Sequence, residues 1–444
     1  MSDTIFALAS APGKAGVAVI RISGPGAADA LRDLAGSLPR PRQAVYRRLC
    51  DRRAGEILDD GIAIYFKAPA SFTGEDVAEL HLHGGRAVLN AVFAALGARP
   101  GFRIAEPGEF TRRAFLNGKF DLTAAEAVAD LVAAETAAQR RQALRQLDGE
   151  FGRLCTAWRE RLIWAQARLE AEIDFPEDDL PAALWASVQG EVSALAEEIA
   201  AELADDRRGE RLRNGVSVAI VGPPNAGKSS LMNALAQRDV AITSQLAGTT
   251  RDVIEVELDL GGYPVILADT AGLRPAGDAL EEEGIRRARA RAEAADLRLV
   301  VVDAAKPEEF AAIRSYLGHD SILIANKIDL VDGGIAAVIS ALDGRPALPV
   351  SVLTGAGMAE LIRYLTERIG ESLTSGHAPL VTRARHRQAL EACRDALRRF
   401  ASVKLPELAA EDLRTAATAL GRITGRIDVE DMLDALFREF CIGK

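Results

Sequence analysis

The segment GPPNAGKSS, which begins at Gly222, constrains the fold of this chain more than any other stretch. It matches the pattern G-x-x-x-x-G-K-[ST] and lies directly between the apolar run VSVAIV and the helix-like run SSLMNALA. Glycines in such a loop let backbone amides curl around phosphate groups, Lys228 can reach the outer phosphates, and the Ser229 hydroxyl can bind magnesium. The pattern alone has false matches, but its place between a strand and a helix predicts a phosphate-binding loop.

The stretch from about Asn214 to Glu371 alternates short apolar runs with Gly-rich turns and helix-like segments. Runs such as LRLVVVDA are apolar almost throughout, as strands buried on both faces of a parallel sheet are. Helix-like composition flanks this stretch on both sides. The sequence therefore predicts a multidomain α/β and α+β protein. The expected domains are 1–119 (N-terminal, α+β), 120–212 and 374–444 (two parts of a helical domain) and 213–373 (an inserted P-loop domain with a mostly parallel sheet).

An apolar stripe within the first helical part recurs at three- and four-residue steps. Its members are Leu144, Leu147, Phe151, Leu154, Trp158 and Leu162. This spacing predicts one long helix with that face in the core.

Two further motifs specify a guanine nucleotide. DTAG, from Asp269 to Gly272, ends one apolar run; its aspartate can support magnesium and its last amide can meet the γ-phosphate. NKID, from Asn326 to Asp329, ends another run. The Asp329 carboxylate can accept two hydrogen bonds from guanine, whereas adenine offers no such donor pair. Ser351 can complete the base pocket through backbone groups. Taken together, these motifs predict a Ras-like G domain that binds GTP and Mg2+.

The group that activates water is not evident from these motifs. Ras-like enzymes carry a glutamine after DTAG, but Leu273 stands there and cannot hydrogen-bond water. AGTTRD supplies the other switch, with Thr250 as the expected magnesium ligand. Arg251 and Arg274 are candidates for an arginine finger, although each is more simply a solvated surface charge.

Charge and cysteine content exclude several classes of protein. The 444 residues carry a formal net charge of -10, which argues against a broad basic face that coats nucleic acid. The four cysteines are far apart and predict neither a disulfide framework nor a zinc cluster. The N-terminus does not resemble a signal peptide, and no apolar run reaches the roughly 20 residues of a membrane span. We expect a cytoplasmic protein without a membrane partner.

The motifs GPPNAGKSS, AGTTRD, DTAGLR, NKID and the terminal FCIGK together resemble the MnmE (TrmE) family of tRNA-modification GTPases. In the first domain, SFTGEDVAELHLHGG and RIAEPGEFTRRAFLNGKFDL add to the resemblance. The resemblance implies a homodimer that works with the flavoprotein MnmG to add an aminomethyl-type group at carbon 5 of the wobble uridine of certain tRNAs. A 5-formyl- or methylene-tetrahydrofolate would supply the one-carbon unit.

The resemblance also implies that potassium replaces an arginine finger when two G domains approach each other. Its ligands would come from Asn225, Ser244, Leu246 and Thr249, with a serine where the family usually has a threonine. The catalytic glutamate maps onto Glu281, with Glu282 and Glu283 as rivals within one turn. The residues expected to contact GTP or its metal ions are Asn225, Ala226, Gly227, Lys228, Ser229, Ser230, Ser244, Gln245, Leu246, Ala247, Gly248, Thr249, Thr250, Asp269, Thr270, Ala271, Gly272, Asn326, Lys327, Asp329 and Ser351.

By the same resemblance, the residues that would bind folate are Arg21, Glu79, Lys119 and Lys444. A pterin ring has paired donors that Glu79 can accept, while the cations suit the acidic end or the formyl oxygen. From the sequence alone, Arg21 is better explained as an edge-strand charge, and the resemblance reverses that preference. His81 and His83 share one face of an expected strand, but no third ligand for a metal is evident.

Cys441 is the remaining candidate for catalysis. As a thiolate it would be a nucleophile, and a nearby Lys444 would lower its pKa. A small apolar thiol that helps to dock the end of the chain is an equally good interpretation. Two other functions remain open at this point: a ribosome-assembly GTPase, and a GTP-switched scaffold that recruits the catalytic partner.

Overall fold

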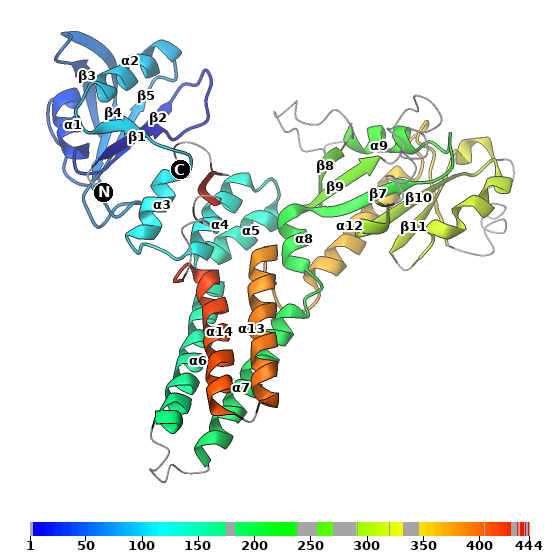
Figure 1. Cartoon of the computed structure of the whole chain (residues 1–444). Helices are drawn as coiled ribbons and strands as arrows, with labels where there is room; N and C mark the ends of the chain where they lie inside the picture. The colour runs from blue at the N-terminus through cyan, green and yellow to red at the C-terminus, as the bar shows by residue number, and fades with distance from the viewer. Residues whose placement is uncertain are drawn as a thin grey trace, which may run out of the picture. The chain divides into compact units, whose positions relative to one another are not determined.

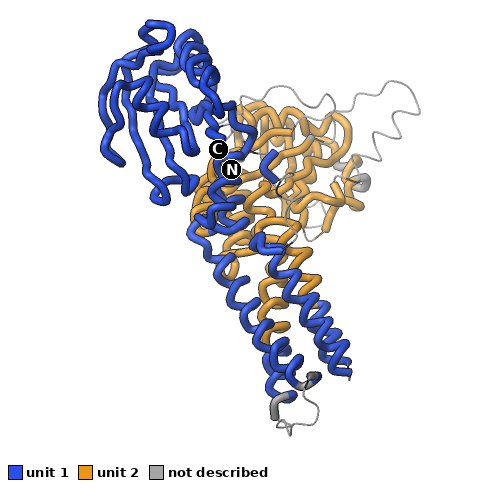
Figure 2. The backbone as a smooth tube through the Cα atoms, turned by 60° about the vertical axis from the view of Figure 1, so that its left-hand side comes forward, with its two compact units in different colours: residues 1–129, 146–193, 395–444 blue, residues 130–145, 194–394 orange. Residues whose placement is uncertain are grey.

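The computed structural model describes residues 3–174, 183–237, 255–269, 290, 292–318, 320–331, 346–403, 405–427, 433, 436–438, 440 and 443. The chain forms two compact units (Figure 2). Unit 1 comprises Met1–Ala129, Gln146–Ser193 and Asp395–Lys444, and unit 2 comprises Asp130–Arg145 and Ala194–Arg394. The chain therefore passes from unit 1 to unit 2 and back twice. The domain boundaries expected above stay predictions.

A six-stranded sheet forms the N-terminal part of unit 1 (Figure 1). Its strands are β1 (Thr4–Leu8), β2 (Ala18–Ser23), β3 (Val45–Asp51), β4 (Glu56–Phe66), β5 (Val77–Leu82) and β6 (Phe102–Ile104). They lie in the order β3-β4-β5-β2-β1-β6, and each neighbouring pair is antiparallel except β1 with β6. This mixture of sheet and helices is the α+β architecture expected for the N-terminal part.

The alternation of side chains along the strands decides which face of this sheet is covered. Ile20, Ile22 and Leu80 are fully buried against α1 (Ala27–Ala35) and α2 (Arg86–Gly97). The neighbouring positions on β2 and β5 point to the opposite face, where Arg21 pairs with Glu79. One face therefore packs against these two helices, and the other carries polar groups beside a smaller apolar cluster that includes Ala7 of β1 and Phe110 of the helix after β6.

Unit 1 also contains the short helix α3 (Glu109–Leu116) and two long helices, α6 (Glu150–Asp174) and α14 (Pro406–Thr424). The two long helices pack side by side (Figure 1). Four helices contribute residues to both units: α4 (Leu122–Ala133), α5 (Ala137–Leu147), α7 (Ala183–Leu203) and α13 (Ala384–Ser402). The end of the chain returns to unit 1, where Leu433, Phe437 and Phe440 pack with Leu122.

The apolar stripe that begins at Leu144 lies on two helices, not on one as its spacing predicted. Helices α5 and α6 are separate because Gly149, between them, adopts φ +77°, a left-handed conformation that ends a helix. Phe151 and Trp158 on α6 are buried, whereas Leu144 on α5 is 42% exposed. The expectation of a single buried helical face was wrong at its N-terminal end.

A second six-stranded sheet forms the core of unit 2. Its strands are β7 (Val216–Val221), β8 (Glu255–Leu260), β9 (Tyr263–Asp269), β10 (Leu297–Asp303), β11 (Ser321–Asn326) and β12 (Leu348–Pro349), in the order β12-β11-β10-β7-β9-β8. Neighbours are parallel except β8 with β9. Around the sheet lie α8 (Arg208–Asn214), α9 (Lys228–Ala236), α12 (Met358–Thr374) and the 3-10 segments η1 (Pro307–Tyr316) and η2 (Ile328–Leu330).

The central strands of this sheet are buried on both faces, as their unbroken apolar runs predicted. On β10, Leu299 and Val301 belong to one apolar cluster, whereas Val300 and Val302 belong to another. This arrangement of strands and helices confirms the inserted P-loop domain with a mostly parallel sheet. No helix within the described ranges combines the length and the apolar character that crossing a lipid bilayer requires.

The turn of the β8–β9 hairpin is fastened to α5. The backbone N–H of Ala138 donates to the carbonyl of Gly262 at 3.0 Å, and the Gly262 N–H donates to the Asp259 carboxylate at 2.6 Å. Gly261 and Gly262 have φ +63° and +93°, which side chains other than glycine rarely adopt. Because β9 ends at Asp269 of DTAG, α5 contacts an element that leads directly into the expected nucleotide site.

Candidate nucleotide and folate sites

The loop after β7 has the conformation of a phosphate cradle. Gly222 and Gly227 adopt φ +148° and +98°. A Cβ at Gly222 would lie 2.1 Å from the carbonyl oxygen of Val301, and one at Gly227 would lie 2.2 Å from Nδ2 of Asn326. Both glycines are therefore required by close approach as well as by backbone angle. The loop leads into the N-terminus of α9, where backbone N–H groups favour anions.

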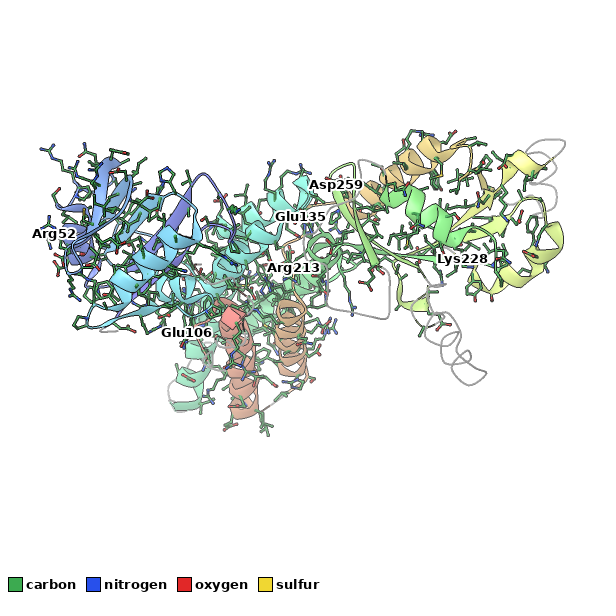
Figure 3. All side chains as sticks on the ribbon, turned by 90° about the horizontal axis from the view of Figure 1, so that it is seen from above. Arg52, Glu106, Glu135, Arg213, Lys228 and Asp259 are labelled. Atoms are coloured by element: carbon green, nitrogen blue, oxygen red, sulfur yellow. The ribbon has the colours of Figure 1, made fainter. Side chains whose placement is uncertain are left out.

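Lys228 is the first residue of α9, and Figure 3 shows its place at the start of that helix. Its Nζ donates to the carbonyls of Gly222 at 2.9 Å and Pro223 at 2.7 Å. The ammonium group is therefore held against the loop that precedes it. This position suits the role predicted for it, in which it meets the outer phosphates.

Asn326 connects the phosphate loop to the loop expected to hold the base. Its side-chain amide donates to the carbonyl of Ala226 at 2.9 Å, and its Oδ1 accepts from the backbone N–H of Val352 at 3.3 Å. Asn326 is only 2% exposed, so both bonds replace water that these groups would otherwise bind. NKID thus fixes two loops that are far apart in the sequence.

Lys327 makes a second link to the phosphate loop. Its Nζ donates to the carbonyl of Asn225 at 2.8 Å and pairs with the Asp303 carboxylate at 2.7 Å. Asp303 ends β10 and is almost fully buried. Asp303 belongs to none of the motifs named above; its signal in the sequence was a lone carboxylate at the end of the apolar run LRLVVVDA. Asn225 and Lys327 both adopt left-handed backbone angles, with φ +61° and +63°.

The expected base-binding residues lie on neighbouring loops. Asp329 is exposed, so its carboxylate is accessible to a base. Ser351 is fully buried, and its Oγ accepts from the backbone N–H of Thr354 at 3.2 Å. The Ser351 carbonyl accepts from Gly355 at 2.8 Å, which turns the chain at this point. The two loops follow β11 and β12, which are adjacent in the sheet.

Several expected residues lie outside the described part of the structure. They are Ser244, Gln245, Leu246, Ala247, Gly248, Thr249, Thr250, Thr270, Ala271, Gly272, Glu281, Cys441 and Lys444. For Asp269 only the backbone is described; it ends β9, in register with Ile220 of β7 just before the phosphate loop. The potassium, magnesium and catalytic roles of these residues stay predictions.

Arg21 and Glu79, two of the expected folate residues, contact each other on the face of the first sheet that α1 and α2 leave uncovered. Nε of Arg21 lies 3.0 Å from Oε1 of Glu79, and both side chains are partly exposed. The rings of Phe72 and Phe110 lie 5.3 and 5.8 Å from the guanidinium carbon, close enough for cation–π contact. His81 adds an imidazole 3.5 Å from the Glu79 carboxylate.

Lys119 and the end of the chain approach the same part of unit 1. Nζ of Lys119 donates to the carbonyl of Pro69 at 2.9 Å, on the loop that carries Phe72. Gly443, one residue from the C-terminus, has φ +104°, and a Cβ there would lie 2.1 Å from the carbonyl oxygen of Leu8. Leu8 ends β1, which pairs with β2, the strand that carries Arg21. Gly443 therefore lies against the end of β1, the strand next to the one that carries Arg21.

The histidine pair shows no sign of a metal site. His81 contacts Glu79, and Nδ1 of His83 lies 2.8 Å from Asp59. Within the described ranges, no group of three or more metal-ligating side chains was found.

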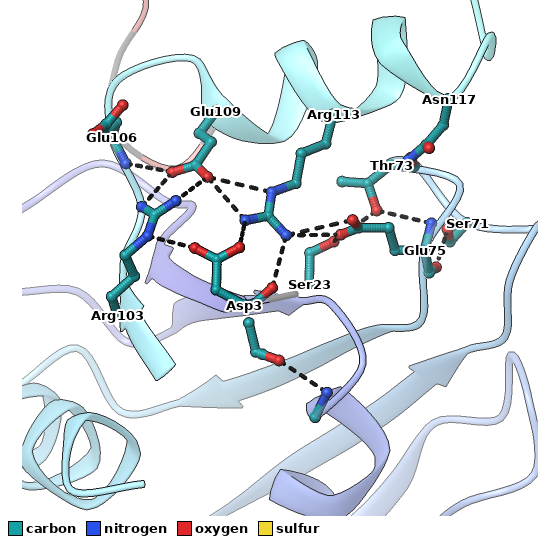
Figure 4. Close-up of polar contacts among 12 residues, drawn as sticks. Asp3, Ser23, Ser71, Thr73, Glu75, Arg103, Glu106, Glu109, Arg113 and Asn117 are labelled. Carbon is teal, nitrogen blue, oxygen red and sulfur yellow. Dashed lines mark hydrogen bonds and ion pairs between the residues drawn. The ribbon is translucent and has the colours of Figure 1, made fainter. Parts of the chain in front are cut away.

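A network of charged residues, which the sequence analysis missed, lies at the edge of the first sheet (Figure 4). Arg113 is 1% exposed and contacts the carboxylates of Asp3, Glu75 and Glu109. Arg103 binds both oxygens of Glu109, at 2.8 and 2.6 Å. Burial acts to raise the pKa of Glu109, but the two arginines and a backbone N–H outweigh it and lower that pKa. Every member is paired within the network, so we assign it a structural role.

Comparisons with known proteins match nearly the whole length of the chain. One family model, the MnmE helical domain, matches residues 122–441, and another, the GTP-binding protein TrmE N-terminus, matches residues 4–119. The tRNA modification GTPase MnmE of Rhodospirillum rubrum is 54% identical over 455 residues, covering 100% of this chain and 99% of that protein. The protein of the same name from Parvibaculum lavamentivorans is 56% identical over 453 residues, covering 100% of both.

Solved structures match smaller parts of the chain. The G domain of the T. maritima iron transporter FeoB is 30% identical and covers 35% of this chain and 98% of that chain, with a TM-score of 0.26. Aquifex aeolicus Era bound to GDP.AlF4- is 27% identical and covers 43% of this chain and 69% of that chain, with a TM-score of 0.29.

Proposed function

This chain belongs to the MnmE family of tRNA modification GTPases, and on that premise we propose a potassium-dependent GTPase cycle that drives modification of carbon 5 of the wobble uridine in certain tRNAs. The chain is a GTP hydrolase that acts in tRNA modification. The finer proposals concern the cation, the one-carbon donor, the partners and the residues. The observation that carries them is full-length similarity at 54–56% identity to relatives that bear this name.

In the proposed cycle, GTP and Mg2+ bind the loop that begins at Gly222. Lys228 meets the outer phosphates, Ser229 and Thr250 bind the metal, and Asp329 accepts hydrogen bonds from guanine. The links from Asn326 and Lys327 to the phosphate loop support this assignment, because they join the base and phosphate ends of one site.

Potassium would supply, in place of an arginine finger, the positive charge that stabilises the transition state. Asn225 is the proposed ligand on the phosphate loop, with Ser244, Leu246 and Thr249 on the switch. Glu281 positions the water through a second water molecule. These groups come together when the G domains of two subunits meet, so hydrolysis is coupled to a conformational change.

The one-carbon donor is a tetrahydrofolate derivative bound on the face of the first sheet that carries Arg21 and Glu79. Glu79 accepts from the pterin and Arg21, Lys119 and Lys444 bind its acidic or formyl groups. The contact between Arg21 and Glu79, flanked by Phe72, supports this proposal, because a flat ring system needs an apolar wall as well as polar anchors.

Two copies of this chain pair through the N-terminal domain and act with MnmG on tRNA in the cytoplasm. Tyr46 on β3 and Ile62 on β4 share the face that carries Arg21, and they are 68% and 38% exposed. Exposed apolar side chains on a sheet face support a protein contact there. Cys441 takes part in the chemistry on the base, and MnmG performs the remaining steps.

The test of the GTPase proposal is hydrolysis in potassium against sodium at equal ionic strength. We expect strong stimulation by potassium, lost in Asn225→Ala and kept in Asn233→Ala, which changes an exposed asparagine on α9. Glu281→Ala should abolish hydrolysis, while Glu282→Ala and Glu283→Ala retain it. Equal rates in both salts would contradict the cation mechanism.

The test of the tRNA chemistry separates Cys441 from the GTPase cycle. Cys441→Ser should abolish modification of tRNA by the protein with MnmG and leave GTP hydrolysis nearly intact. Cys50→Ser is the matched control, because Cys50 is a partly exposed thiol on β3. If Cys441→Ser loses both activities, the thiol docks the tail and does no chemistry.

A further inference from the structure

A cavity of about 540 Å³ lies in unit 2, between α5, α8, β9 and the C-terminal end of α12. Its floor is apolar and is formed by Ala138, Leu212, Tyr263, Leu373 and Pro379. Ala138, Leu212 and Leu373 are buried, so the floor belongs to the core of the unit. A cavity of this size can hold a small organic molecule.

Two arginines border the same cavity. Arg141 and Arg145 are one helical turn apart on α5, so their guanidinium groups project from the same side of the helix. Leu144 lies between them and is 42% exposed, which extends the apolar lining to the rim. The cavity therefore has an apolar floor and two cationic side chains on one side of its rim.

These guanidinium groups form no ion pair with any carboxylate in the described ranges, unlike other arginines of unit 2. Arg213 and Arg383 pair with Asp130, and Arg387 pairs with Asp205 and Glu210. Among the residues that the structure describes, no Asp or Glu lines the cavity. His377 also borders it but lies 3.4 Å from Glu202, so any charge it carries already has a partner. In a chain of net charge -10, two adjacent arginines that lack a carboxylate partner are placed to bind an external anion.

We propose that this cavity binds a small organic anion with an apolar body, whose acidic group is held by Arg141 and Arg145. The planar guanidinium fork matches the oxygens of a carboxylate and of a phosphate alike. The predicted ligand is therefore either kind of oxyanion, joined to an apolar body. The site is separate from the GTP and folate sites. Its occupant contacts Tyr263, the first residue of the strand that ends at Asp269.

The experiment uses the full-length protein with excess GDP and Mg2+, so that the nucleotide site is filled. Anilinonaphthalene sulfonate is the anionic probe, and phenylnaphthylamine, the same skeleton without the sulfonate, is the neutral one. Fluorescence titration should show that Arg141→Gln with Arg145→Gln weakens binding of the anion at least about tenfold, as losing a charge-assisted hydrogen bond does, and leaves the neutral probe unchanged.

Two further variants make the test specific. Arg140→Gln changes the neighbouring arginine of α5, which does not line the cavity, and should leave both probes unchanged. Thr374→Trp places a large ring in the cavity from the exposed end of α12 and should weaken both probes. Competition by naphthyl phosphate against naphthoate then shows which oxyanion the site prefers. Equal binding of the anionic probe in all variants, or competition by neither compound, would overturn the proposal.

Discussion

Gly227→Ala tests whether Asn326 holds the phosphate loop in its binding conformation. The new Cβ would lie 2.2 Å from Nδ2 of Asn326, a distance at which one of the two groups must move. Nδ2 is the atom that donates to the carbonyl of Ala226. The substitution therefore strains the loop directly and also displaces the side chain that fastens it.

The magnitude follows from these two effects. Gly227 has φ +98°, and a left-handed conformation costs a residue with a Cβ about 1–2 kcal/mol. Loss of the Asn326 bond adds about 1 kcal/mol. Because the nucleotide binds only the original loop geometry, the sum of about 2–3 kcal/mol appears as a loss of affinity of roughly 30- to 150-fold.

The assay is a double-mutant cycle on the affinity for mant-GDP, with Gly227→Ala, Asn326→Ala and the double variant. In the Asn326→Ala background there is no amide for the new Cβ to displace, so only the backbone strain remains. We expect Gly227→Ala to cost about fivefold less there than in the original protein, a coupling of about 1 kcal/mol. An equal loss in both backgrounds would refute the role of Asn326, and no loss in either would refute the loop geometry.

Three further predictions concern unit 1 and the buried thiols. Arg113→Met should raise amide hydrogen exchange in β1 and β2 about 30-fold at pH 7, since breaking a buried ion-pair network costs about 2 kcal/mol when some partners keep other bonds; unchanged exchange would contradict this. The pKa of Glu109 is lowered from its ordinary value of 4.5, so the ionised carboxylate stabilises the fold above pH 4.5. This stabilisation is lost as the pH falls through the folded pKa, so the free energy of unfolding derived from amide exchange should be lower at pH 4 than at pH 7. Burial raises the pKa of Cys393 to about 12, so iodoacetamide should modify Cys50 well before Cys393 in a mass-spectrometric time course.

The sequence was most informative where local chemistry decides the structure. GPPNAGKSS and NKID each follow a buried strand, and the structure places them at the ends of β7 and β11, on either side of β10, with Asn326 bonded to Ala226. Apolar runs with no alternation correctly predicted strands buried on both faces. In these segments, motif, strand pattern and turn residues all agree with one fold.

Contacts between segments far apart in the chain could not be predicted from the sequence. Arg113 is buried because it meets carboxylates of Asp3 and Glu75, and nothing local indicates that these segments come together. The end of α5 before Gly149 was also not predicted. The apolar spacing continues across this position, and spacing alone does not show that a residue adopts a left-handed conformation. The expected roles of the switch residues, Glu281 and Cys441 stay predictions.

The arrangement of unit 1 in three segments has a consequence for synthesis on the ribosome. Phe437 and Phe440 pack with Leu122, more than 300 positions earlier in the chain. Unit 2 ends at Arg394 and can close while the last residues are still being made, because domains generally fold as units during translation. Unit 1 cannot bury the surface around Leu122 until the tail leaves the exit tunnel. A nascent chain truncated before Phe437 should therefore carry a finished nucleotide unit and an N-terminal part that still exposes apolar surface to chaperones.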